Sequence, residues 1–193
     1  MKIRPFRPII ILPQEDLRQR SKKVGYIDDA VRDLVEEMKA ATLDWEDNRE
    51  HEVGVALAAV QIADCRRVVI IRDNFDDKKN RNFQVFINPE ITKYEGAIEE
   101  DYEGCLSVVD IYGKVPRHTK VRIKALNLAG EVVRVKAEGF LARVFQHEID
   151  HTNGLVFVDH IKDKKEAFYS LTDKGNLEKL NYDESIAENR ILW

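Results

Sequence analysis

The sequence predicts an α+β fold in which antiparallel strands and hairpins pack around a central helix, with an N-terminal helix and a short C-terminal helix. Two stretches carry apolar residues at helical spacing, and several shorter stretches alternate apolar and polar residues as half-buried strands do. The strand-like stretches follow one another without a regular helix between them, which favours α+β over a repeated βαβ order. A chain of 193 residues can bury one sizeable core, so we expect a single domain over residues 1–193.

The first helix is predicted from Asp28 or Asp29, either of which can cap it, to about Leu43. One face of this segment is apolar and is expected to face the core. That face is formed by Val31, Leu34, Val35, Met38 and Thr42. The charged segment 44–53 is expected to be a loop.

Four strands are predicted after this loop. Residues 67–72 contain a run of β-branched residues typical of a buried strand, and a second strand is expected from 83 to 87, ending near Asn88 and Pro89. The segments 121–126 and 131–137 alternate apolar and charged residues on either side of a turn at 127–130. This pattern predicts a β-hairpin that leads directly into the next helix.

The second helix is predicted from about Gly139 to Gly154, because glycine suits the position after a helix C-terminus. It contains His-Glu-Ile-Asp-His at 147–151, an HExxH motif. Residues four apart lie on one helical face, so His147 and His151 can bind one metal ion while Glu148 is placed to act as a base. A catalytic site of this kind needs three protein ligands, so one ligand is still missing.

Three positions are candidates for the third ligand. A metzincin would have a histidine where this chain has Phe157, and a thermolysin-like enzyme would use a downstream glutamate, for which Glu166 lies in a segment typical of a solvated helix face. Cys105 lies in a short apolar turn, and no disulfide framework explains it because Cys65 is the only other cysteine. A Cys-His-His set suits Zn²⁺ or Fe²⁺. Cys65 belongs to no motif and is expected to be a structural thiol.

A third segment, 54–61, is rich in small and apolar residues and ends in Gln61. Small residues let the backbone approach a ligand closely, and the Gln61 amide can donate a hydrogen bond to a developing oxyanion.

These three segments resemble the ordered motifs of the peptide deformylase family. The family's EGCLS motif is matched completely at 103–107, and its QHExDH motif is matched at 146–151. Its G-Φ-G-Φ-A-A-x-Q motif, in which Φ is hydrophobic, is matched at Gly54, Ala58, Ala59 and Gln61. Similarity extends through 10–13, 17–18 and 115–117, so the resemblance covers most of the first 160 residues.

The resemblance implies a metal-dependent hydrolase that removes the N-formyl group from the formylmethionine of newly synthesised polypeptides and releases formate. The implied metal ligands are Cys105, His147 and His151, with Fe²⁺ favoured and Zn²⁺, Ni²⁺ or Co²⁺ able to replace it. Glu148 is the implied acid and base, and the Gln61 amide and Leu106 N–H are the implied oxyanion donors. The expected substrate contacts are Gly54, Val55, Ala56, Glu103, Gly104 and Tyr112, and Arg117 could contact the substrate backbone.

Three positions depart from the family pattern. Ala56 replaces the second glycine of the first motif, Val109 replaces a proline after EGCLS, and Thr152 replaces a leucine after the second histidine. We expect these changes to alter pocket shape and efficiency, because every residue expected to do chemistry is present. Two alternatives stay open, an HExxH metallopeptidase and an inactive deformylase-like binding protein.

The composition limits the kinds of partner that we expect for this chain. A formal net charge of −4 argues against a general nucleic-acid binder, and no apolar stretch is long enough to span a membrane. We expect N-formylmethionyl nascent peptides as partners, with a transient ribosome contact left open. The expected location is the cytoplasm, and Met1 favours a bacterial chain.

The remaining expectations concern the C-terminal part and three histidines. From about Asp163 we expect a short helix containing Ala167, Phe168 and Leu171, then a polar tail ending at 191–193. Surface or structural roles are expected for His51, His118 and His160.

Overall fold

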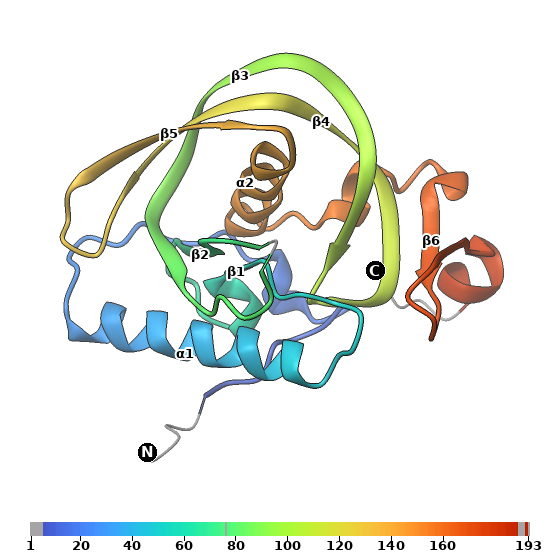
Figure 1. Cartoon of the computed structure of the whole chain (residues 1–193), viewed down its shortest axis with the longest axis horizontal. Helices are drawn as coiled ribbons and strands as arrows, with labels where there is room; N and C mark the ends of the chain where they lie inside the picture. The colour runs from blue at the N-terminus through green and yellow to red at the C-terminus, as the bar shows by residue number, and fades with distance from the viewer. Residues whose placement is uncertain (1–5, 76, 189–191, 193) are drawn as a thin grey trace.

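In the computed structural model, which describes residues 6–75, 77–188 and 192, a strongly curved antiparallel sheet wraps around the helix at 139–152 (Figure 1). Hydrogen-bonded neighbours run in the order β1-β2-β3-β4-β6-β7, and β5 also pairs with β4. The strands are β1 (Ala56–Ala58), β2 (Val68–Arg72), β3 (Phe83–Cys105), β4 (Val108–Leu126), β5 (Val132–Glu138), β6 (Phe168–Leu171) and β7 (Leu177–Lys179). The α-helices are α1 (Asp29–Asp47) and α2 (Gly139–Thr152), and short helical turns are η1 (Glu15–Arg18), η2 (Ala59–Ile62), η3 (Phe157–His160), η4 (Lys165–Ala167) and η5 (Asp183–Ala187).

The antiparallel α+β architecture is confirmed. Figure 1 shows α2 inside the arch formed by the long β3–β4 hairpin, while α1 lies along another side of the sheet. The side chain of Asp28 accepts the first-turn N–H of Val31 and so caps α1, as its sequence position predicted. The helix continues four residues beyond Leu43, to Asp47. None of the helices in the described part of the chain is both long enough and apolar enough to cross a membrane.

The strands predicted at 83–87 and 121–126 are real but far longer than expected. Pro89 has no N–H to give to a ladder, so the sequence predicts that the first of these strands ends there. Asn88 has a φ of 53°. In the structure both residues fall in a register shift between Ile87 and Glu90, after which pairing with β4 resumes. The β3–β4 hairpin therefore continues to Cys105, which lies at its turn.

The predicted C-terminal helix is wrong. Within the predicted segment only the turn η4 is helical, and the chain then forms β6, in which Phe168 pairs with Gly113 and Ser170 with Ile111 of β4. A tight turn with Gly175 at φ 75° leads back into β7. Pairing with the open edge of β4 thus determines the conformation of a segment whose apolar spacing is also compatible with a helix.

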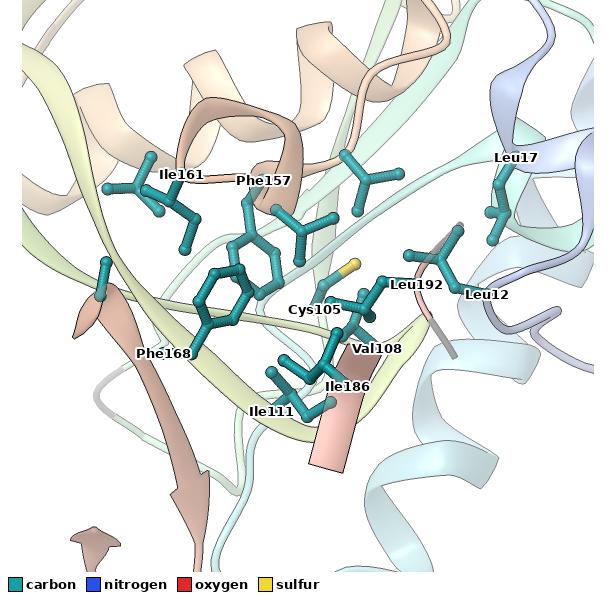
Figure 2. Packing of buried hydrophobic residues seen from close by; sticks show 14 residues of the cluster. Leu12, Leu17, Cys105, Val108, Ile111, Phe157, Ile161, Phe168, Ile186 and Leu192 are labelled. Atoms are coloured by element: carbon teal, nitrogen blue, oxygen red, sulfur yellow. The ribbon is translucent and has the colours of Figure 1, made fainter. Parts of the chain in front are cut away.

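The predicted polar tail also buries apolar residues. Ile186 and Leu192 belong to a cluster that includes Cys105, Val108 and Phe157 (Figure 2). Both side chains are at most 1% exposed. Ile191 and Trp193 of the predicted tail lie outside the described residues.

Candidate active site

The Cys105 thiol meets His147 and His151 at the turn of the β3–β4 hairpin. The three potential ligand atoms all lie within 4.8 Å of one another, and the Cys105 Sγ atom is 3.2 Å from the Nε2 atom of His151. The hairpin supplies the thiol, and one turn of α2 supplies both imidazoles. The three residues that were singled out from sequence are therefore neighbours in space, with a donor set suited to one divalent metal.

The Gln61 amide is fixed beside the thiol. Its oxygen accepts the N–H of Ala58 at 2.9 Å, and its nitrogen donates to the Ser107 hydroxyl at 3.1 Å and to the Cys105 Sγ atom at 3.5 Å. The N–H of Ser107 also donates to the same sulfur, at 3.4 Å. Gln61 is 1% exposed, so its N–H groups have a single defined direction.

The second ring nitrogen of His147 is held by Glu103. The Nδ1 atom lies 3.0 Å from Oε2 of the carboxylate, which directs the Nε2 atom toward Cys105 and His151. Burial alone would raise the pKa of Glu103, but hydrogen bonds from His147 and Arg117 hold it well below its ordinary value. Glu103 is therefore an anion inside the protein.

Two buried arginines balance this anion. Arg117 donates to both Glu103 oxygens, at 2.9 and 3.1 Å, and Arg143 donates to one of them at 2.8 Å. Arg117 also donates to the Asp150 carboxylate at 2.5 Å, and that carboxylate lies 2.7 Å from the His160 ring. A charged network thus lies directly behind the histidine pair.

Glu148 is buried without a full set of partners. It is 4% exposed, and its Oε2 atom has no hydrogen-bond partner among the described residues. Burial raises the pKa of Glu148 to about 7. His151 differs, because burial keeps its pKa well below the ordinary histidine value and so favours the neutral ring that a metal requires.

A cavity of about 300 Å³ opens beside these groups. Its lining includes Cys105, His147, Glu148 and Gln61. Besides Gln61, six of the expected substrate and oxyanion residues lie in its wall: Val55, Ala56, Glu103, Gly104, Leu106 and Tyr112. Most of the wall is apolar, so the cavity can take an apolar side chain next to the potential metal ligands.

Two residues expected to contact a substrate have other positions. Gly54 does not line the cavity; its N–H donates to Glu46 at 2.8 Å and its carbonyl accepts from Arg72, so it anchors the segment before β1. Arg117 is buried behind Glu103 and also does not line the cavity. Arg117 donates its hydrogen bonds to the carboxylates of Glu103 and Asp150 instead of to a peptide in the cavity.

Sequence reasoning missed Arg143 and the contacts of Tyr112. Arg143 precedes His147 by four residues on a largely buried helix, and a charge in such a place signals a buried partner. The Tyr112 hydroxyl donates to Glu52 at 2.8 Å, across 60 residues of sequence, and no local pattern indicates that pairing. His51 lines the cavity as well, whereas His118 and His160 do not.

Comparison with known proteins identifies the family. A family model described as Polypeptide deformylase matches residues 6–167, most of the chain. The chain belongs to the polypeptide deformylase family. A peptide deformylase of Mesorhizobium japonicum is 41% identical over 161 residues, covering 83% of this chain and 87% of that protein, and one of Agrobacterium fabrum is 39% identical, covering 81% and 87%.

Solved structures of the family agree with the fold. A peptide deformylase of Synechococcus elongatus, in complex with actinonin, has a TM-score of 0.78 at 29% identity and covers 97% of this chain and 90% of its own. A peptide deformylase of Legionella pneumophila has a TM-score of 0.71 at 40% identity and covers 81% and 86%. As a member of the polypeptide deformylase family, the chain is an amidohydrolase that removes N-formyl groups from newly synthesised polypeptides.

Proposed function

We propose that Cys105, His147 and His151 hold one divalent metal ion and that Glu148 and Gln61 act beside it to hydrolyse the formyl amide of N-formylmethionyl peptides. The observation that carries this proposal is the convergence of three ligand atoms within 4.8 Å at the wall of a cavity that Glu148 also lines. The proposed location is the cytoplasm, where nascent chains emerge from ribosomes. We also propose a transient contact with the ribosome.

The residues present fit a metal ion. One thiol and two imidazoles match the donors that Fe²⁺, Zn²⁺, Ni²⁺ and Co²⁺ accept, and the resemblance to the family favours Fe²⁺. His147 bonds Glu103 through Nδ1, which fixes the other nitrogen for coordination. When bound, such an ion lowers the pKa of a coordinated water and polarises a carbonyl group.

Glu148 is the proposed proton carrier. Its unpaired Oε2 atom can accept the proton of an attacking water, and the same group can return the proton to the leaving amine. Burial raises the pKa of Glu148 to about 7, which suits a group that takes up and releases a proton at neutral pH. The buried carboxylate therefore links attack on the formyl carbon to departure of formate and a free amine.

Gln61 and Leu106 are the proposed donors to the formyl oxygen. The Gln61 nitrogen is oriented by Ala58 and Ser107, and Leu106 follows the Cys105 ligand in the hairpin turn. Donors fixed before the reaction stabilise developing negative charge without reorganising. Val55, Ala56, Gly104 and Tyr112 form the proposed walls around the substrate.

The deformylase reading is favoured over the alternative of an HExxH endopeptidase. Phe157, at the position where a metzincin has its third ligand, is 1% exposed and packs in the apolar cluster, with its ring 6.1 Å from that of His147. Glu166 is exposed in the turn η4 and lies outside the cavity wall. Of the three candidates, Cys105 has the chemistry and the position of a third ligand.

Formate release tests the proposal. The chain is purified anaerobically with Fe²⁺ and given formyl-Met-Ala-Ser, and Glu148→Gln is compared with the exposed control Glu166→Gln. General-base catalysis contributes about 10²–10⁴-fold, so Glu148→Gln is expected to lose that factor in kcat while Glu166→Gln keeps the wild-type rate. An undiminished rate in Glu148→Gln, or no formate from the wild-type protein, would overturn the proposal.

A further inference from the structure

A buried arginine lies one helical turn before the first histidine of α2. Arg143 and His147 are four residues apart, so their side chains lie on the same face of the helix. Arg143 is only 7% exposed. A buried guanidinium is costly unless its donors are satisfied, so its partners indicate why it is retained there.

The Arg143 guanidinium joins α2 to both strands of the long hairpin. One terminal nitrogen donates to the Val115 carbonyl of β4 at 2.7 Å, and the other donates to the Glu99 carbonyl of β3 at 2.8 Å. These two strands carry Cys105 at their turn. The same side chain thus ties the helix that holds the histidines to the hairpin that holds the thiol.

The third contact of Arg143 leads to His147. The nitrogen that bonds Val115 also donates to Oε1 of Glu103 at 2.8 Å, and Oε2 of the same carboxylate is 3.0 Å from Nδ1 of His147. Arg117 contacts both oxygens but also spans to Asp150. Arg143 therefore supplies a second fixed point for the Glu103 carboxylate, from the same helix as the histidine.

Charge balance gives an independent argument. Glu103 and Asp150 are two buried or half-buried carboxylates next to the histidine pair, and Arg117 and Arg143 are two guanidinium groups that contact them. Removal of Arg143 would leave the two anions with one arginine. The Glu103 carboxylate would then lose a charge-assisted hydrogen bond and would share Arg117 with Asp150.

We propose that Arg143 is a positioning residue for His147, acting through the Glu103 carboxylate to set the orientation of the proposed metal ligand. This inference rests on the metal site of the proposed function. The competing route is a direct contact with the substrate, because Arg143 also lines the cavity. The two routes differ in what they change, since a substrate contact alters KM and leaves metal affinity intact.

Metal affinity in the absence of substrate is the decisive readout. Co²⁺ is titrated into the full-length apoprotein in competition with a chelator, and binding is followed by the thiolate-to-cobalt absorption. Loss of a group that orients a ligand typically costs about 10–100-fold in metal affinity, and we expect this for Arg143→Met. Arg143→Lys, which keeps the charge but loses the forked donors, is expected to lose less.

Arg134→Met is the matched control, because Arg134 is an exposed arginine on β5. It is expected to bind Co²⁺ as tightly as the wild-type protein. If Arg143→Met does not fold, as judged by circular dichroism, the same measurements are made with Arg143→Lys. An affinity of the folded Arg143 variant equal to that of the wild type would overturn the inference, even if KM rises.

A double-mutant cycle tests the route through Glu103. If Arg143 acts through Glu103, Arg143→Met should change the Co²⁺ affinity little in a protein that already carries Glu103→Gln. The remaining change should be within about 0.5 kcal/mol, or roughly 2-fold, which is the margin to which independent effects add. A full effect in that background would overturn the inference. If the wild-type protein binds no Co²⁺, or if His147→Ala binds it normally, the proposed function fails instead, which keeps the two failures distinct.

Discussion

Gly104 leaves no space for a side chain next to the proposed thiolate ligand. A Cβ atom built there would lie 2.4 Å from Cε1 of Tyr112. We predict that Gly104→Ala displaces the Tyr112 ring, breaks its 2.8 Å hydrogen bond to Glu52, raises KM and destabilises the protein by about 1–3 kcal/mol. Steady-state kinetics and urea unfolding measure the two effects.

Gly25→Ala is the matched control for this change. A Cβ atom at Gly25 would meet no atom within 4 Å. Its KM and its free energy of unfolding should equal those of the wild type. Equal behaviour of the Gly104 and Gly25 variants would show that the Tyr112 ring does not define the cavity wall.

Single residues could be chosen from sequence where chemistry and spacing agree. The i, i+4 histidines follow from helix geometry, and Cys105 follows from the resemblance of 103–107 to the family's EGCLS motif. The bonds of Glu103 to Arg117 and Arg143 could not be predicted, because they depend on the register of β3 with β4 across bulges that no local pattern sets. Gly54 and Arg117 were expected to contact the substrate, and both lie outside the cavity wall.

At the scale of elements, two glycines bound the helix that carries the histidines. Gly139 and Gly154 have φ values of 57° and 80°, where side chains are disfavoured. A Cβ atom at Gly139 meets nothing within 4 Å, whereas one at Gly154 would lie 2.3 Å from the Arg18 carbonyl oxygen. We predict that Gly139→Ala costs about 1–2 kcal/mol and that Gly154→Ala costs more, because backbone must move.

Urea unfolding of the two variants measures this difference. The Gly139 variant reports the conformational cost alone, and the difference between the variants reports the close approach of η1 to the end of α2. Equal costs would mean that the Arg18 segment yields freely to a methyl group.

The N-terminal segment is joined to α1 by an ion pair that depends on pH. Arg7 donates to both Glu37 oxygens, at 2.8 and 2.7 Å, and these hydrogen bonds lower the pKa of Glu37 below its ordinary value of 4.5. A carboxylate whose pKa is lower in the folded than in the unfolded protein stabilises the fold at pH values above its unfolded-state pKa. That contribution is lost as the pH falls through the folded-state pKa. The Arg7 side chain is 40% exposed, so screening limits the contribution to about 1 kcal/mol or less.

Arg7→Met is therefore predicted to destabilise the protein at pH 7, and the difference from wild type should shrink as the pH falls from about 5 toward 3. Urea unfolding at several pH values measures the trend. A difference that grows on acidification would contradict the assignment.

Elements were predicted well where periodicity is local, and poorly where pairing is long-range. The capped helix α1 and the segment 68–72 required only their own residues. Asn88 and Pro89 indicate a strand end, and they mark instead a bulge that the β4 pairing bridges. Phe168 likewise lies in a strand because it pairs with Gly113 at the free edge of β4. The sequence of the C-terminal segment does not reveal this pairing.

At the scale of the whole molecule, the C-terminal segment completes the apolar cluster behind Cys105. Ile186 is fully buried there, together with Val108 and Phe157 (Figure 2). Truncation of such a side chain costs about 2–5 kcal/mol, so we predict a loss in this range for Ile186→Ala. Denaturant unfolding measures the loss.

Ile98→Ala is the control, since Ile98 lies on β3 and is 63% exposed. Its unfolding free energy should stay within about 0.5 kcal/mol of the wild type. If both variants behave alike, the segment around η5 does not share the core of the molecule.

The contact between Cys105 and His151 spans 46 residues of sequence, and that interval contains all of β4 and β5. The two ends can meet only after the hairpin has closed and α2 has docked inside the arch. A metal ion captured by these residues would therefore act as a late cross-link that forms after the order of the strands is settled. Metal uptake would then follow folding in time, and the loaded fraction of a preparation would report how many molecules had completed the arch.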